Sequence, residues 1–162
     1  MSDAPSEPAF DPALDPVWAT LVEDAWKARE GAVCRYSGFA VGAVLQDEHG
    51  RRFTGANVEN ASYNLGLCAE RVALYHAITH GAGRIVHVAI TTEAVEPTSP
   101  CGACRQALWE FAPEAVVLLV NRTGCRQATV RALLPEGFDH SALEATARTQ
   151  GHEHDTNDRP PR

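Results

Sequence analysis

The stretch Cys68-Ala69-Glu70, together with Pro100-Cys101-Gly102-Ala103-Cys104 further along the chain, decides how this sequence is interpreted. It supplies three thiols and one carboxyl group. Three thiolates can hold a zinc ion and leave its fourth position for water, which is the arrangement of a catalytic zinc site. Glu70 is not needed as a ligand, so its carboxylate is available to move protons. We therefore expect Cys68, Cys101 and Cys104 to bind one Zn²⁺ and Glu70 to be the catalytic acid and base.

The combination of the two segments is more specific than either segment alone. A Cys-x-x-Cys pair by itself is weak evidence, because redox pairs and structural zinc sites share it. Zinc deaminases have a His or Cys ligand, a Glu two residues later, and then Pro-Cys-x-x-Cys, and this chain resembles that pattern. Taken alone, Glu70 would be interpreted as an acid that stabilises the first turn of a helix. Arg71 lies on the same helical face as Cys68, so it is either a surface arginine or a donor to the ligand sulfurs.

Composition and charge indicate a soluble domain that acts on a small molecule. The chain has 162 residues, of which 44% are hydrophobic and 22% charged, and a formal net charge of -7. Nucleic-acid binding usually needs a basic patch, and the only adjacent basic pair, Arg51-Arg52, is explained by a turn. The apolar run 115–120 is far too short to cross a bilayer. We therefore expect a nucleoside-sized substrate, with neither a nucleic-acid nor a membrane partner.

The cysteines and the two ends of the chain indicate a cytoplasmic protein with one domain. Five cysteines, an odd number, indicate metal ligands and free thiols in a reducing compartment rather than a disulfide framework. Residues 1–12 are acidic and rich in proline, without the apolar core of a signal peptide. We expect residues 1–12 to be disordered, residues 13–147 to form the catalytic domain, and residues 148–162 to be a polar, disordered tail. Cys34 and Cys125 lie outside the zinc pattern.

The pattern of apolar residues predicts an α/β fold. Asp15 followed by Pro16 is a typical helix start, and apolar residues at helical spacing follow it. The order of elements predicts a three-layer α/β/α domain with a five-stranded mixed sheet and helices on both faces. The expected helices are 16–30, 68–79 and 101–111, and the expected strands are 39–46, 51–56, 84–92, 115–121 and 127–130.

The chain resembles the small, homotetrameric, zinc-dependent cytidine deaminase family over roughly residues 15–140. Besides the zinc pattern, which extends to Arg71 and over Ser99–Gln106, three segments carry the resemblance. These segments are Tyr36-Ser37-Gly38-Phe39-Ala40-Val41-Gly42-Ala43, Asn57-Val58-Glu59-Asn60-Ala61-Ser62-Tyr63, and Leu133-Leu134-Pro135 with Phe138. One departure is Ala40, where the family often has proline, and this departure does not affect the chemistry.

The resemblance implies a function and a role for each matching residue. It implies hydrolytic deamination of cytidine and deoxycytidine in pyrimidine salvage, one Zn²⁺ per subunit, and a homotetramer with shared active sites. The implied roles are pyrimidine packing for Phe39, ribose binding for Asn57 and Glu59, substrate binding for Ala69, moderation of thiolate charge for Arg71, and completion of a neighbouring subunit's pocket for Ala61, Tyr63 and Phe138.

Three other functions are compatible with parts of the pattern. A related deaminase could act on a different aminopyrimidine nucleoside, such as blasticidin S, and the segment 57–63 argues for a plain nucleoside instead. A nucleic-acid editing deaminase is opposed by the acidic net charge. A non-catalytic zinc-binding interaction module is opposed by the presence of Glu70.

Overall fold

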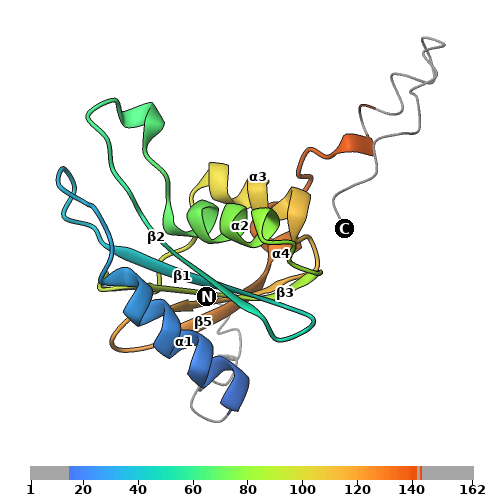
Figure 1. Cartoon of the computed structure of the whole chain (residues 1–162), viewed down its shortest axis with the longest axis horizontal. Helices are drawn as coiled ribbons and strands as arrows, with labels where there is room; N and C mark the ends of the chain where they lie inside the picture. Colours follow the sequence, from blue (N-terminus) through green and yellow to red (C-terminus); the bar gives the residue numbers. More distant parts are fainter. Residues whose placement is uncertain (1–14, 142, 144–162) are drawn as a thin grey trace, which may run out of the picture.

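The computed structural model describes residues 15–141 and 143, so the disorder predicted for residues 1–12 and 148–162 lies outside the described residues. Five strands form one sheet with helices on both faces, which confirms the predicted three-layer α/β class (Figure 1). The helices are α1 (Pro16–Arg29), α2 (Ala69–Thr79), α3 (Gly102–Phe111), the short α4 (Val130–Leu133) and the 3₁₀ turn η2 (Tyr63–Leu65), and the strands are β1 (Val41–Asp47), β2 (Arg52–Ala56), β3 (Ile85–Thr92), β4 (Val116–Val120) and β5 (Cys125–Thr129).

The sheet has the strand order β2-β1-β3-β4-β5. β3 and β4 are parallel, and the other neighbouring pairs are antiparallel. A parallel pair needs a crossover connection that returns the chain to the starting edge. The chain between β3 and β4 is this crossover, and it contains α3. As a result, α3 lies beside α2 on one face of the sheet, while α1 covers the other face (Figure 1).

Apolar side chains on the two faces of the sheet form two separate hydrophobic cores. Successive side chains of a strand point to opposite faces, so Val44 packs with α1 while Leu45 packs with α2 and α3. On the α1 side, Trp18 and Leu21 are buried against the sheet. On the other side, Leu74 of α2 and Leu108 of α3 are buried within one cluster. The two helices expected to carry the zinc ligands are therefore fixed against the same apolar layer.

The start of α1 follows the sequence prediction. The side chain of Asp15 accepts a hydrogen bond from the backbone N–H of Val17 at 2.9 Å, and Pro16 occupies the first helical position. This capping satisfies a donor that the helix itself cannot pair. None of the helices in the described part of the chain has the length and apolar character needed to span a membrane.

Strand β1 begins two residues later than predicted. Phe39 lies before the strand, because the side chain of Asn57 replaces the sheet hydrogen bonds at this point. The Asn57 amide donates to the Phe39 carbonyl at 2.9 Å and accepts from the Val41 N–H at 2.8 Å. Gly38, with φ +69°, turns the chain just before this contact. Phe39 is thereby placed in a loop at the end of the strand rather than in the sheet.

Strand β5 and two short helices also differ from the prediction. β5 begins at Cys125 rather than at residue 127, because the side chain of Asn121 accepts hydrogen bonds from the backbone N–H groups of Thr123 and Gly124 and closes a tight turn. Neither η2 nor α4 was expected. In α4, the Thr129 side chain accepts from the Ala132 N–H at 3.1 Å, which starts a helix where the strand was expected to continue.

Candidate active site

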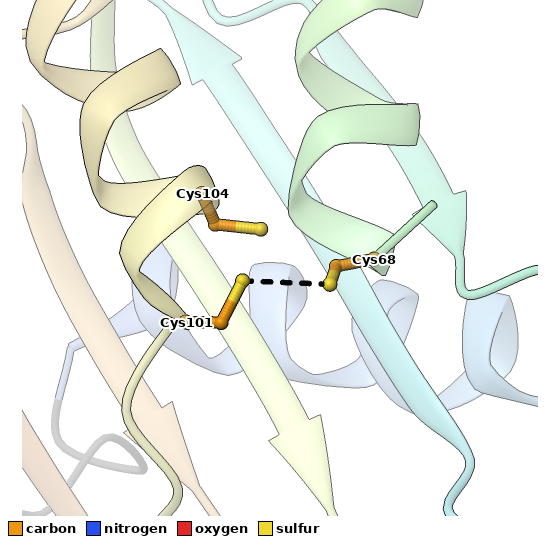
Figure 2. Close-up of side chains that lie close together, drawn as sticks. All are labelled: Cys68, Cys101 and Cys104. Carbon is orange, nitrogen blue, oxygen red and sulfur yellow. Dashed lines mark hydrogen bonds between the residues drawn. The ribbon is translucent and has the colours of Figure 1, made fainter. Parts of the chain in front are cut away.

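Three thiols meet where α2 and α3 begin. Cys68 immediately precedes α2, Cys101 immediately precedes α3, and Cys104 lies in the first turn of α3. Their sulfur atoms lie within 4.8 Å of one another, and the Cys68 and Cys101 Sγ atoms are 3.6 Å apart. Figure 2 shows the three side chains pointing toward one another from the two helices. A cluster of three soft sulfur donors fits zinc, so the residues present match the expected metal.

The surroundings of the thiols favour negative charge on Cys68 and oppose it on Cys104. Hydrogen bonding with Cys104 lowers the pKa of Cys68 to about 5, with Cys101 and Arg71 acting in the same direction. The same contact with Cys68, together with burial, raises the pKa of Cys104. Cys68 and Cys101 also cap the positive ends of their helices, where anions are stabilised. In a metal-free cluster the thiols share protons, and a bound zinc ion would displace them.

Arg71 lies within reach of the ligand sulfurs. Burial by itself would lower the pKa of its guanidinium, but interactions with Cys68 and Cys104 raise it. One terminal nitrogen donates to the Gly66 carbonyl at 3.3 Å, while Nε has no hydrogen-bond partner among the described residues. Of the two interpretations that the sequence allowed, this geometry favours a donor that reduces the charge of the thiolates over a surface arginine.

Glu70 is buried at the start of α2, with only 5% of its surface exposed. Burial raises the pKa of its carboxyl group to about 6, and the negative charge of Cys68 adds to the effect. A group that moves protons works best when its pKa is near the working pH. An acid that only stabilises the first turn of a helix is normally exposed, whereas Glu70 is buried. This burial raises its pKa and so suits it to transfer protons.

One cavity connects the thiols with the residues predicted to bind substrate. It has a volume of about 410 Å³, within the range of small-molecule sites, which is about 300–1,000 Å³. Three predicted substrate-binding residues, Phe39, Asn57 and Glu59, share its wall with Cys68, Cys101 and Glu70. The remaining lining residues are Ser37, Val41, Ile90, Thr92, Thr98 and Ser99. Ala69 is fully buried and does not line this cavity.

Asn57 and Glu59 are held in place by the loop that precedes β1. Asn57 is buried and bridges Phe39 and Val41, as described above. Glu59 accepts hydrogen bonds from the backbone N–H of Tyr36 at 2.7 Å and from the N–H and hydroxyl groups of Ser37. The Ser37 hydroxyl is the main contact that lowers the pKa of Glu59, so this carboxyl group is ionised near neutral pH. In the single chain the Glu59 side chain is half-buried.

A second cavity of about 380 Å³ lies next to the first and shares Ser37 and Glu59 with it. Tyr63 lines this second cavity, with 79% of its surface exposed, and its ring contacts that of Tyr36 at 5.8 Å. Ala61 and Phe138 are exposed and line neither cavity. The structure therefore does not bring Ala61, Tyr63 or Phe138 into the thiol cavity of their own chain.

Several cavity residues were missed by sequence reasoning. Ser37 belongs to a quoted segment but was given no role, and Thr98 and Ser99 lie in the loop before Cys101. Ser99 opens the quoted segment Ser99–Gln106 but was given no role, and the only signal for Thr98 was its position just before that segment. A Ser or Thr in a loop has no local feature that distinguishes a cavity wall from a solvated surface.

Three clustered thiols with a Glu that is not a ligand, in a Cys-x-Glu and Pro-Cys-x-x-Cys pattern, are typical of the zinc deaminases. Residues 18–120 match the family described as the cytidine and deoxycytidylate deaminase zinc-binding region. The chain belongs to this zinc-binding family, and its thiol cluster is positioned to hold a metal ion.

Individual relatives agree with this assignment. A cytidine deaminase of Halalkalibacterium halodurans is 45% identical over 120 residues, which cover 73% of this chain and 91% of the relative. The crystal structure of a cytidine deaminase from Burkholderia pseudomallei has a TM-score of 0.72 and 43% identity, and the match covers 74% of this chain and 98% of that one. A cytidine deaminase structure from Mycobacterium tuberculosis has a TM-score of 0.65 and 38% identity, covering 75% and 96% of the two chains.

Proposed function

We propose that this chain is a zinc-dependent hydrolase that deaminates cytidine and deoxycytidine to uridine and deoxyuridine and releases ammonia. The observation that carries the proposal is one cavity whose wall combines Glu70 and two of the clustered thiols, Cys68 and Cys101, with Phe39, Asn57 and Glu59. The family match and relatives described as cytidine deaminases support the same substrate. Among the described residues, none that lines either cavity is basic, which favours a neutral nucleoside over a phosphorylated one.

The residues of the cavity divide the chemistry between them. Cys68, Cys101 and Cys104 would hold the zinc ion, which when bound would supply the Lewis acidity that makes a water molecule acidic enough to lose a proton near neutral pH. Glu70 would take one proton as the water adds to C4 of the pyrimidine and pass it to N3. It would then take the remaining proton of the added oxygen and pass it to the amine, so that ammonia leaves as the C4 carbonyl forms. Burial of Glu70 excludes bulk water, which would otherwise compete for the proton.

The remaining wall of the cavity recognises the nucleoside. Phe39 packs against the pyrimidine, and Asn57 and Glu59 bind a ribose hydroxyl. Because Glu59 is ionised and already accepts from Ser37, it is oriented to accept one more hydrogen bond. A site built to hydrogen-bond a hydroxyl group can reject analogues that lack it by a large factor. Substrate binding by Ala69 is the part of the proposal that the cavity of the single chain does not support, because this residue is buried outside the cavity wall.

The active form is a homotetramer whose subunits complete one another's sites. Tyr63, Leu65 and Phe138 are 79%, 64% and 58% exposed, and the segment that carries Tyr63 and Leu65 extends away from the sheet (Figure 1). Large apolar groups that contact so little of their own chain indicate an interaction surface. Ala61, Tyr63 and Phe138 then serve a neighbour's cavity.

The cellular setting follows from the product and from the thiols. Uridine and deoxyuridine are pyrimidine nucleosides that can be reused, so the role is pyrimidine salvage. None of the five cysteines forms a disulfide, and thiolate ligands persist in a reducing compartment. We therefore place the protein in the cytoplasm.

An absorbance assay with a panel of substrates tests the function. The zinc-loaded protein is incubated with cytidine, deoxycytidine, deoxycytidylate and blasticidin S, with Glu70→Gln as the matched control. Turnover of the two nucleosides, lost in the control, is expected. Preference for deoxycytidylate or blasticidin S would identify a different branch of the family. Absence of turnover with all four, in a protein that binds zinc, would favour the non-catalytic module instead.

A further inference from the structure

Arg105 follows the zinc ligand Cys104 directly on α3, and its guanidinium makes three hydrogen bonds. Its Nε donates to the carbonyl of Pro100 at 2.8 Å, and one terminal nitrogen donates to the hydroxyl of Ser99 at 2.9 Å. The other terminal nitrogen donates to the carbonyl of Leu133 at 2.9 Å. The side chain is half-buried, and it takes part in none of the ion pairs found among the described residues.

Two of the three residues that Arg105 contacts belong to the segment that leads into Cys101. Ser99 and Pro100 immediately precede Cys101, and Ser99 lines the same cavity as Glu70. The loop between β3 and α3 contains no regular hydrogen-bonded element after Thr92, so side-chain contacts decide its course. Leu133 lies at the end of α4, which makes Arg105 a link between this loop and a separate element.

We propose that Arg105 is a positioning residue that holds the Ser99–Cys101 segment, and thereby sets both the retention of zinc and the fit of the nucleoside. The second half of this proposal rests on the proposed function, whereas the first half does not. Residues that orient metal ligands typically change metal affinity or activity by about 10- to 100-fold when they are replaced. Arginine suits this position because a planar fork can reach three acceptors at once, which a lysine ammonium on a flexible stem does poorly.

Zinc release provides a test that does not depend on activity. Zinc-loaded wild-type protein, Arg105→Met, Arg105→Lys and Ser99→Ala are mixed with a chromogenic chelator, and the rate of zinc loss is followed well below the unfolding temperature. Arg131→Met is the control, because Arg131 lies on the surface and pairs with Glu114. We expect Arg105→Met to lose zinc about 10- to 100-fold faster, Arg105→Lys to lose it at an intermediate rate, and the control to match the wild type.

Steady-state kinetics with cytidine show whether Arg105 positions the Ser99–Cys101 segment or only supports the fold. Arg105→Met should raise KM together with the rate of zinc loss, and Ser99→Ala should raise KM with little change in zinc loss. In Arg105→Ala, guanidinium ion at low millimolar concentration should slow zinc release, while the wild type should not respond.

The proposal is wrong if Arg105→Met has a lower melting temperature but the zinc-release rate and KM of the wild type, since that combination describes a purely structural arginine. If Arg105→Met does not fold, the zinc-release rates and KM values of Arg105→Lys and Arg105→Ala are compared with the wild type in the same way. If the wild type turns over no cytidine, the proposed function fails, but the release rates still decide whether Arg105 controls the metal site.

Discussion

Glu70 and Cys68 lie on either side of Ala69 at the start of α2, and both line the same cavity. Both groups are negative when ionised, so their charges repel each other. The negative charge of Cys68 and burial both raise the pKa of Glu70. A carboxyl group with an ordinary pKa would be a poor proton donor near neutral pH. The spacing of one residue between Cys68 and Glu70 therefore raises the pKa of Glu70 as well as placing both groups at the cavity.

Replacing Glu70 with glutamine should abolish turnover without removing zinc. Glutamine is close in size to glutamate but cannot exchange a proton, and a general acid/base group typically contributes about 10²- to 10⁴-fold to the rate. We expect kcat for cytidine to fall at least 10²-fold, while metal analysis and circular dichroism match the wild type. A variant that keeps more than about a tenth of wild-type kcat would exclude Glu70 from this role.

Replacing Cys101 with alanine should remove zinc from the protein. Two thiolates bind zinc much more weakly than three, and the loss should also lower stability, because zinc binds only the folded site. Cys34→Ala and Cys125→Ala are the controls, since neither cysteine belongs to the thiol cluster. Metal analysis should give about one zinc per chain for the wild type and both controls. Full zinc content in Cys101→Ala would refute the ligand assignment.

Asp47 is a buried carboxylate far from the metal site, and it should give the stability a marked dependence on pH. Burial by itself would raise its pKa, but the N–H groups of Gly83, Arg51 and His49 and the Arg51 guanidinium outweigh burial and lower the pKa. Arg51 Nε lies 2.8 Å from the carboxylate. Because the folded pKa is lower than the unfolded value, the contribution to stability is present above the unfolded value and is lost as pH falls through the folded pKa.

Asp47→Asn should therefore lower the stability near pH 7 and have almost no effect on it in strong acid. A hydrogen bond to a charged group contributes about 1.5–3 kcal/mol, and we expect a loss of about this size at pH 7. The difference in unfolding free energy between wild type and variant should shrink as pH falls below about 4. Denaturant titrations at several pH values measure it. A difference that does not change with pH would mean that the charge of Asp47 contributes nothing.

Gly42 should not tolerate a side chain, because β1 and α1 approach each other closely there. A Cβ atom at this position would lie 2.0 Å from the Ala25 carbonyl oxygen and 2.7 Å from the Arg29 nitrogen. Both are backbone atoms, so α1 would have to move. Gly42→Ala should cost about 1–3 kcal/mol or more, measured by thermal unfolding. Gly124→Ala, where a Cβ meets no atom within 4 Å, should stay within about 0.5 kcal/mol of the wild type.

The shared active site can be tested by subunit complementation. Glu70→Gln subunits keep Tyr63 but cannot move the proton, whereas Tyr63→Ala subunits keep Glu70 but contribute no ring to a neighbour. After the two variants are dissociated, mixed and reassembled, some interfaces combine an intact Glu70 with an intact Tyr63. Activity should then rise above the mean of the two parents, and light scattering should give the mass of a tetramer.

Two results would contradict the shared site. A fully active monomer would show that no neighbour is needed. No rise in activity, with mixing confirmed by mass spectrometry, would mean that Tyr63 serves its own subunit or none.

The sequence by itself determined the chemistry and the class of fold. Cys68-Ala69-Glu70 and Pro100-Cys101-Gly102-Ala103-Cys104 predict the metal ligands and the acid by residue type and spacing, which are local properties, and the structure brings these three thiols together. Asp15 and Pro16 marked the start of α1, because capping depends on the first few residues of a helix. Strand and helix order was likewise sufficient for the α/β class.

Only the tertiary structure decided how these pieces meet. The crossover from β3 to β4 returns α3 to the face that carries α2, and this brings Cys101 to Cys68 across 32 intervening residues. The Asn57 side chain that holds Phe39 outside β1, and the Arg105 contact with Leu133, also join segments far apart in the chain. Residue type and spacing report local geometry, whereas these contacts depend on which segments the packed core brings together, and that is a property of the whole fold.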